Sequence, residues 1–258
     1  ALSSGSWTQL GSDINGEASN DQSGYSVSMN DAGDRVAIGA PYNDGASNSS
    51  GHVRIYAYSS NSWTQLGSDI DGNPSNDESG WSVSMNAAGD RVAIGAREND
   101  DSANDAGHVR VYAYSSNSWT QLGSDIDGES SNDKSGWSVS LNSDGDRVAI
   151  GAIYNDASGT NAGHTRVYAY SSNSWTQLGS DIDAETAQDQ SGYSVSMNDA
   201  GDRVAIGARY AEAPNDGDAG HVRLYAYSSN SWTQLGSDID GEDGGDHSGY
   251  SVSLNDAG

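Results

Sequence analysis

The sequence predicts an all-β protein built from repeated four-stranded antiparallel units, and three observations lead to this prediction. The motif Ser-Trp-Thr-Gln-Leu-Gly occurs five times in the 258 residues, with its tryptophans 56, 56, 56 and 57 residues apart. Each repeat contains four short runs of β-forming residues separated by turn residues. No stretch carries apolar residues at helical spacing. A fixed period means that one structural unit is copied, and four antiparallel strands without a helix form a β-propeller blade.

The strands of the first complete repeat follow one another with short connections. We expect them at residues 25–29, 35–39, 52–58 and 62–66, and the first and third alternate with a period of two. The turn at 30–34 has Gly33 where a left-handed residue is needed, and the turn at 59–61 is equally short. We expect a single domain, residues 1–258, with complete blades near residues 23–66, 79–122, 135–178 and 191–235.

The two ends of the chain each carry one further strand motif. A lone fourth strand precedes the first complete blade, and a lone first strand follows the last one. Five copies of 56 residues would take 280 residues, which is 22 more than the 258 present. The terminal strands could share a short blade that closes a five-bladed ring. The alternatives are a segment of a longer array, or open edges that pair with a neighbouring subunit.

The composition is acidic and poor in apolar residues. There are 37 acidic and 11 basic residues, a formal net charge of −26, and 34% hydrophobic residues. Such values are typical of disordered chains, but a disordered chain does not keep aromatic and aliphatic residues in register over four repeats. The charge repels phosphate backbones and argues against nucleic-acid binding. Apolar runs of about five residues exclude a helical membrane span, and the absence of cysteine excludes disulfides.

Two motifs in the repeats resemble those of FG-GAP repeats, the blade type of the integrin α-chain propeller and of many microbial surface proteins. Gly-Tyr-Ser-Val at residues 24–27 is similar to the first motif, with Ser23 in place of its Phe. Gly-Ala-Pro at 39–41 matches the second, and later copies read Gly-Ala-Arg or Gly-Ala-Ile. The resemblance covers essentially the whole chain and implies an extracellular, ligand-binding propeller. Integrin-type repeats often carry a calcium loop where this chain has only the turn at 30–34, so that site is not carried over.

The connections between the second and third strands differ most between copies. In an antiparallel blade they share one face of the disc with the links that join the blades. Variable loops on one face predict a binding site there, for a glycan or a protein ligand, and neutral drift in unconstrained loops is the alternative. The expected ligand-binding residues are Tyr42, Asn43, Asp44, Asn99, Asp100, Tyr154, Asn155, Asp156, Asn215 and Asp216.

The links between blades carry alternating carboxylates, as in Asp-Ile-Asp-Gly-Glu at residues 125–129. Such a pattern, with a Gly for a sharp bend and a further Asp beyond it, suits Ca²⁺, which prefers oxygen ligands. The alternative is a turn whose carboxylates cap backbone N–H groups. No other cofactor is expected. The candidate calcium ligands are Asp69, Asp71, Asp77, Asp125, Asp127, Asp133, Asp181, Asp183, Asp189, Asp238, Asp240 and Asp246.

Other recurring residues favour structural roles. One histidine per repeat precedes the third strand, and we expect it to make a structural hydrogen bond because blades hold the copies apart. Eight of the 11 basic residues recur at fixed strand positions and are expected to pair with aspartates. The repeated tryptophan is expected to pack between blades, with stacking on sugars as the alternative. Asn48 begins an Asn-Ser-Ser sequon and is a glycosylation candidate. The histidines are His52, His108, His164 and His221.

The sequence shows no nucleophile–base arrangement and no nucleotide-binding loop, so we expect no enzymatic activity. It favours a non-catalytic recognition or adhesion module outside the cell or at the cell surface, binding a glycan or protein ligand with or without Ca²⁺. The alternative is a structural subunit of an extracellular filament or surface array, in which copies of the chain assemble through open blade edges.

Overall fold

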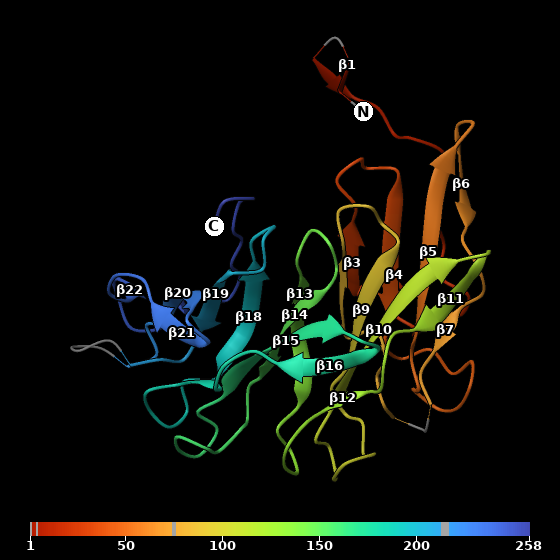
Figure 1. Cartoon of the computed structure of the whole chain (residues 1–258). Coiled ribbons are helices and arrows are strands. Elements are labelled where there is room, and N and C mark those ends of the chain that lie inside the picture. The colour runs from red at the N-terminus through yellow and green to blue at the C-terminus, as the bar shows by residue number, and fades with distance from the viewer. Residues whose placement is uncertain (1, 4, 74–75, 213–216) are drawn as a thin grey trace.

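The computed structural model describes residues 2–3, 5–73, 76–212 and 217–258, and every regular element in these ranges is a β-strand. Four antiparallel sheets of five strands follow one another along the chain (Figure 1). The prediction of an all-β propeller with four-stranded antiparallel blades is therefore confirmed, and a short fifth strand is added to each blade. No helix in the described ranges is long and apolar enough to cross a membrane.

All four blades have the same order of strands. The first blade comprises β3 (Ser26–Met29), β4 (Arg35–Ala40), β5 (His52–Ser59), β6 (Ser62–Gln65) and β7 (Ile70–Asp71). The second comprises β8 (Ser82–Met85), β9 (Arg91–Ala96), β10 (His108–Ser115), β11 (Ser118–Gln121) and β12 (Ile126–Asp127). The third comprises β13 (Ser135–Leu141), β14 (Arg147–Ala152), β15 (His164–Ser171), β16 (Ser174–Gln177) and β17 (Ile182–Asp183). The fourth comprises β18 (Ser191–Met197), β19 (Arg203–Ala208), β20 (His221–Ser228), β21 (Ser231–Gln234) and β22 (Ile239–Asp240). A separate hairpin pairs β1 (Leu2–Ser3) with β2 (Ser6–Trp7).

The fourth strand of each blade is divided into two pieces. In the first blade, β6 pairs with the second half of β5, and β7 pairs with its start, where Asp71 lies opposite His52. Between the two pieces Gly67 has a φ of 72°, a left-handed conformation that turns the chain out of the sheet. The carboxylate-bearing link therefore begins inside the sheet, beside the start of the third strand.

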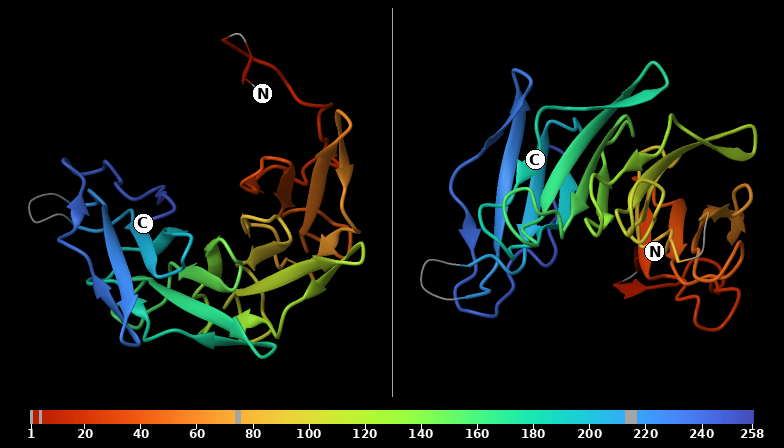
Figure 2. Two further views of the ribbon diagram at one scale, coloured as in Figure 1. Left: turned by 45° about the horizontal axis from the view of Figure 1, so that its top comes forward. Right: turned by 90° about the horizontal axis from the view of Figure 1, so that it is seen from below.

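The four blades lie side by side in an open arc (Figure 2). The first strands β3, β8, β13 and β18 are neighbours along the concave side, and the divided fourth strands lie on the convex side. The first and last blades stand at the two ends of the arc, and the β1–β2 hairpin extends away from the first blade (Figure 1).

Each blade buries its apolar residues against the next blade. Val53, Ile55 and Ile70 of the first blade pack with Met85 and Ile94 of the second. Equivalent clusters fill the other two interfaces between blades. Each strand therefore needs few apolar residues, because the neighbouring blade supplies the other half of the core. This explains how a chain with 34% hydrophobic residues folds.

The close approach of neighbouring blades requires a glycine in each second strand. A Cβ atom on Gly39 would lie 2.2 Å from the carbonyl oxygen of Gly80 in the next blade. The equivalent glycines Gly95, Gly151 and Gly207 would clash in the same way. Blade packing therefore fixes the glycine of the recurring Gly-Ala pair.

The two terminal segments pack against the neighbouring blade as the internal copies do. Trp63 Nε1 donates a hydrogen bond to the carbonyl oxygen of Leu10 at 2.9 Å. At the other end, Leu254 N donates to Ser196 Oγ at 2.9 Å. Residues 251–254 occupy the place of a first strand, unpaired within the described part of the chain.

Candidate functional site

The loops between second and third strands meet the links between blades at one end of the blades, which we call the loop face. Asn76 N of the first link donates to Asn48 O of the first loop at 2.8 Å, and Ser79 N donates to Ser50 O at 3.0 Å. A parallel β-bridge closes this contact in all four repeats. Each loop is therefore held by the link that leads to the next blade.

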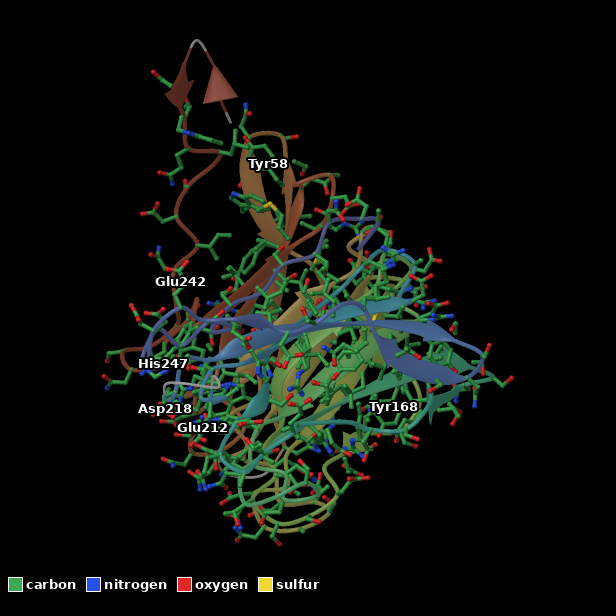
Figure 3. The ribbon with its side chains drawn as sticks, turned by 90° about the vertical axis from the view of Figure 1, so that its left-hand side faces the viewer. Tyr58, Tyr168, Glu212, Asp218, Glu242 and His247 are labelled. Carbon is green, nitrogen blue, oxygen red and sulfur yellow. The ribbon has the colours of Figure 1, made fainter. Side chains whose placement is uncertain are left out.

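Acidic groups gather on the loop face. Figure 3 shows Glu212, Asp218, Glu242 and His247 on the same side of the last blade, away from Tyr58 at the opposite end of the first blade. We call that opposite end, where the short turns lie, the turn face.

The Asn-Asp pairs that the sequence predicts as ligand-binding residues make contacts within the loop face. Asn43 is 4% exposed, and its Nδ2 donates to Asp21 Oδ2 at 2.8 Å. Asp44 Oδ1 accepts a hydrogen bond from Ser49 N at 2.7 Å. These contacts shape the loop; they bury the asparagine, whereas the aspartate stays exposed. Equivalent bonds join Asn99 to Asp77, Asn155 to Asp133, Asp100 to Asp105 N, and Asp156 to Asn161 N.

Three further predicted residues have different positions. Asn48, the glycosylation candidate, is exposed on the first loop. Asn215 and Asp216 lie outside the described residues.

Five aromatic rings form a continuous row where the first strands begin, at the loop face and on the concave side. This aromatic ladder consists of Tyr25, Trp81, Trp137, Tyr193 and Tyr250, one residue from each repeat. Successive ring centroids are 4.5, 5.2, 5.5 and 5.0 Å apart, and the rings are tilted against each other. The predicted Tyr154 contacts the ladder with its centroid 6.4 Å from that of Trp137.

Charged residues that do not belong to the repeated scaffold surround the ladder. Eight basic residues recur at fixed strand positions, and the remaining three of the 11 are Arg97, Lys134 and Arg209. The guanidinium carbon of Arg97 is 3.2 Å from the ring centroid of Trp81, and that of Arg209 is 4.0 Å from Tyr193. Lys134 bonds to a carboxylate beside Arg97. Arg97 and Arg209, which occupy the same position in the second and fourth repeats, therefore stack on the ladder, and Lys134 is linked to Arg97 through Glu98.

Carboxylates balance these cations. Arg97 Nε donates to Glu78 Oε2 at 2.8 Å and lies 3.4 Å from Glu98 Oε1. Burial raises the pKa of Glu78, and burial likewise raises the pKa of Tyr42, which lies close to Glu78 and Arg97. The predicted Tyr42 and Tyr154 thus belong to this site. The sequence signal for the ladder was the aromatic residue that follows Gly in the recurring first-strand motif, Tyr25 and its copies.

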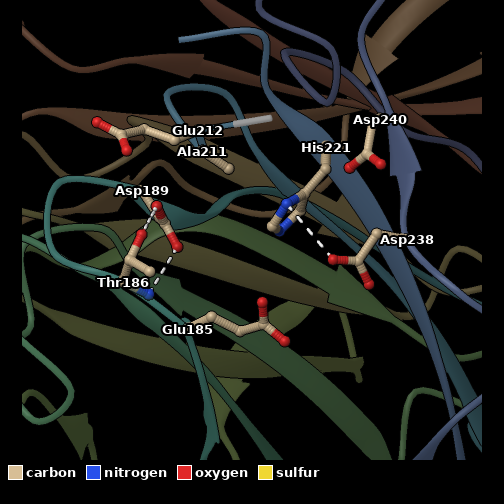
Figure 4. A pocket seen from close by; sticks show the side chains of 8 residues that line it. All are labelled: Glu185, Thr186, Asp189, Ala211, Glu212, His221, Asp238 and Asp240. Carbon is tan, nitrogen blue, oxygen red and sulfur yellow. Dashed lines mark hydrogen bonds and ion pairs between the residues drawn. The ribbon is translucent and has the colours of Figure 1, made fainter. Parts of the chain in front are cut away.

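A second recurring arrangement combines the strand histidine with carboxylates. In each histidine–carboxylate cluster, one histidine nitrogen and two carboxylate oxygens lie within 4.8 Å of one another. The fourth cluster lines a cavity of about 140 Å³ on the loop face (Figure 4). The clusters are Glu17–His52–Asp69, Asp101–His108–Asp125, Glu129–His164–Asp181 and His221–Asp238–Asp240.

Burial lowers the pKa of all four histidines and so favours their neutral form. Burial lowers the pKa of His108 and of His164 to about 4, although neighbouring carboxylates act in the opposite direction. Their Nδ1 atoms lie 3.7 Å from Asp125 Oδ2 and 3.8 Å from Asp181 Oδ2, beyond hydrogen-bond distance. The histidines were expected to make structural hydrogen bonds, but in the described part of the chain neither Nδ1 has a hydrogen-bond partner.

The recurring arginine of the third strand differs between clusters. Arg110 Nη2 donates to Asp125 Oδ2 at 2.8 Å, and Arg223 Nη2 donates to Asp238 Oδ2 at 2.9 Å. In the first and third clusters, the guanidinium instead donates to a backbone carbonyl of the preceding link. Those bonds are Arg54 Nη2 to Asn15 O at 2.8 Å and Arg166 Nη2 to Asp127 O at 2.7 Å.

The predicted calcium ligands have three kinds of position. The first aspartate of each link, and Asp240, belong to the clusters, and Asp183 Oδ1 lies 3.9 Å from His164 Nδ1. Asp71 and Asp127 pair with the third strand as parts of β7 and β12. The third aspartate of each link instead accepts hydrogen bonds from groups of the loop face. Asp77 is 1% exposed and accepts from Asn99 Nδ2, and Asp133 accepts from Ser130 N. Asp189 and Asp246 likewise accept hydrogen bonds from the backbone N–H groups of Thr186 and Asp243.

The repeated tryptophan packs between blades. The indole Nε1 of Trp119 donates to Leu66 O of the preceding blade at 2.8 Å. Its Cδ1 would lie 3.0 Å from a Cβ placed on Gly67. These contacts join the convex sides of neighbouring blades and occupy the indole N–H.

Comparison with known proteins agrees with this architecture. Residues 125–170 match the family model described as FG-GAP repeat. The hydrazine synthase of Kuenenia stuttgartiensis is similar in structure, with a TM-score of 0.54 and 10% identity over 89% of this chain and 53% of that chain. For the periplasmic gluconolactonase of Pseudomonas aeruginosa the TM-score is 0.54 and the identity 13%, over 85% of this chain and 58% of that one. The chain thus spans just over half of each structure, and at these identities the likeness shows the fold alone. No curated protein matches the sequence.

Proposed function

Because this chain is a β-propeller built from FG-GAP repeats, we propose that it is a non-catalytic recognition module that binds a glycan along the aromatic ladder. The observation that carries the proposal is the stacking of Arg97 and Arg209 on the rings of the ladder. The extracellular setting that the resemblance implies is part of the same proposal.

The ladder offers the two kinds of contact that a sugar needs. Aromatic rings present apolar faces to the C–H groups of a sugar, and nearby charged groups hydrogen-bond its hydroxyls. The end rings are the most accessible, with Tyr25 46% exposed and Tyr250 60% exposed. Because the row continues across all the blades, its length favours an oligosaccharide over a single sugar.

A glycan array probed with the wild-type chain, with and without Ca²⁺, tests this proposal. We expect oligosaccharide binding that becomes at least about tenfold weaker in Tyr250→Ala and Arg97→Ala, equivalent to about 1.4 kcal/mol. Tyr58→Ala on the turn face is the matched control and should bind as the wild type does. Silence on all glycans, or equal binding by the ladder variants, would contradict the proposal. Binding to a protein instead would make a protein ligand the better interpretation.

Exposed apolar residues at the two ends of the arc favour a second candidate, association between copies of the chain. Val27 and Met29 of β3 are 63% and 53% exposed, whereas the equivalent Met85 is 7% exposed. At the other end Ile239 is 56% exposed, against 6% for the equivalent Ile70. These end faces are the two halves of the interface that recurs between blades.

Analytical ultracentrifugation over a range of concentrations tests this association. Polymers that dissociate in the Met29→Glu variant would support it, because the new charge would be buried in the contact. A monomer at all concentrations would contradict it.

A further inference from the structure

We propose that His164, Asp181 and Glu129 form a binding site for a divalent transition-metal ion, with Zn²⁺ as the best fit. The ligand atoms of these three residues lie within 4.8 Å of one another. The site comes from three separate segments: Glu129 from the link before the third blade, His164 from β15, and Asp181 from the link after it.

The spacing of the cluster fits an ion better than a hydrogen bond. His164 Nδ1 is 3.8 Å from Asp181 Oδ2 and 3.9 Å from Asp183 Oδ1. A hydrogen bond would need about 3 Å. Two ligands that each lie about 2.1 Å from a tetrahedral Zn²⁺ are about 3.4 Å apart, so small side-chain movements would close the site around the ion.

The histidine provides an independent indication of a ligand. His164 is 1% exposed, and across the described ranges neither of its ring nitrogens has a hydrogen-bond partner. Buried polar atoms are nearly always paired, so an unpaired imidazole that faces carboxylates needs an explanation. A metal ion bound at Nδ1 would satisfy that nitrogen and neutralise the carboxylates together.

The kinds of ligand atom select the metal. An imidazole nitrogen with carboxylate oxygens suits Zn²⁺, whereas Ca²⁺ takes oxygen ligands only. Asp181, which the sequence predicts as a Ca²⁺ ligand, is therefore a Zn²⁺ ligand in this proposal. It shares the ion with His164, for which the sequence predicts a structural role.

The position of the arginine ranks the four clusters. Arg166 donates a hydrogen bond to the backbone carbonyl of Asp127, and its Nη1 lies 3.3 Å from Glu129 Oε1. In the described structure Arg166 therefore makes no hydrogen bond to Asp181 Oδ2. The first cluster is similar, because Arg54 bonds to Asn15 O. In the second and fourth clusters, Arg110 and Arg223 already occupy the equivalent aspartate oxygen. We therefore expect the first and third clusters to bind the ion more tightly than the other two.

Calorimetric titration of the metal-free full-length chain with ZnCl₂ tests the site. The wild type should show two tighter sites and two that are at least about tenfold weaker. His164→Gln should remove one tighter site. The matched control is His247→Gln, because His247 is the one histidine outside the clusters and should leave all sites unchanged. Glu129→Gln alters a 43% exposed side chain and should weaken the same site about tenfold even if His164→Gln fails to fold.

Nitrogen-15 NMR of the histidine rings gives a second readout. Addition of Zn²⁺ should shift the Nδ1 resonance of His164 and leave His247 in place. Unchanged Zn²⁺ affinity in both cluster variants, a Zn²⁺ signal without a ring shift, or binding of Ca²⁺ alone would overturn the proposal. Glycan binding does not enter this readout, so its failure and that of the recognition function are distinguishable.

Discussion

The turn face and the loop face of the blades use the same kinds of side chain in different ways. On the turn face, Asn142 Oδ1 accepts from Arg147 N at 2.9 Å and its Nδ2 donates to Asp146 Oδ1 at 2.9 Å, a pattern that recurs in the other blades. On the loop face, Arg97 has a counterpart only in Arg209 of the fourth repeat, and Lys134 has no basic counterpart. The comparison indicates that residues copied in every repeat build the scaffold, whereas residues that differ between copies distinguish the loop face from the turn face.

The largest effect should come from breaking the contact between blades that both faces depend on. In Gly95→Ala the new methyl group would lie 2.2 Å from Gly136 O and 2.4 Å from Ser82 Oγ. We expect a loss of about 3 kcal/mol or more in the free energy of unfolding, measured by urea denaturation. Gly217→Ala on the loop face, where no atom lies within 4 Å, should change it by less than about 0.5 kcal/mol. Equal stability of the two variants would refute the packing argument.

Acid should weaken the loop face through its buried histidines. The pKa of His164 is about 4 in the folded chain because of burial, against about 6.5 when unfolded. The folded state therefore binds fewer protons, and this contribution is fully present above pH 6.5 and is lost as the pH falls through 4. We expect His164 to contribute a loss of about 2 to 3 kcal/mol in the free energy of unfolding between pH 7 and pH 4.

Urea denaturation at several pH values measures this effect. The wild type should lose more stability on acidification than His164→Gln, and His247→Gln should follow the wild type. The same slope for His164→Gln and the wild type would show that the buried imidazole does not couple folding to pH.

Removal of a single hydrogen-bonding side chain should lower the free energy of unfolding more on the turn face than on the loop face. Asn142 is 3% exposed, and Asn142→Ala leaves buried groups unpaired, so we expect a loss of about 2 kcal/mol. Asp156→Ala removes an exposed bond to Asn161 N of 2.7 Å and should cost less than about 1 kcal/mol. Thermal unfolding of the two variants gives the comparison, and the reverse order would contradict it.

The smallest stability effect should come from the aromatic ladder. Arg97→Lys keeps a positive charge beside Glu78 but loses the flat guanidinium 3.2 Å from the ring centroid of Trp81, a contact worth about 0.5 to 1 kcal/mol. Tryptophan fluorescence should change clearly while the unfolding midpoint hardly moves. Arg91→Ala on the turn face breaks a hydrogen bond to Gly145 O. This variant should lower the unfolding midpoint and leave the tryptophan fluorescence nearly unchanged.

Sequence reasoning recovered the features that depend on neighbouring residues. The strands and the tight turns were predictable because a five-residue turn such as 30–34 carries its own glycine and asparagine. The divided fourth strand was missed, because Ile70 and Asp71 return to the sheet only after the left-handed Gly67. The histidine–carboxylate clusters were also missed as units, since residues such as Glu129 and His164 meet across two blades and no local spacing marks that contact.

The divided fourth strand also affects how the protein behaves at high concentration. An uninterrupted outer strand would present a long row of free backbone N–H and C=O groups, which is a template for pairing with another chain. Here the outer edge of the first blade consists of the four residues of β6 and the two of β7, separated by a glycine that points the chain away from the sheet. The convex rim of the arc therefore presents only short, interrupted strand edges, and we expect these to disfavour sheet-to-sheet pairing between copies of the chain.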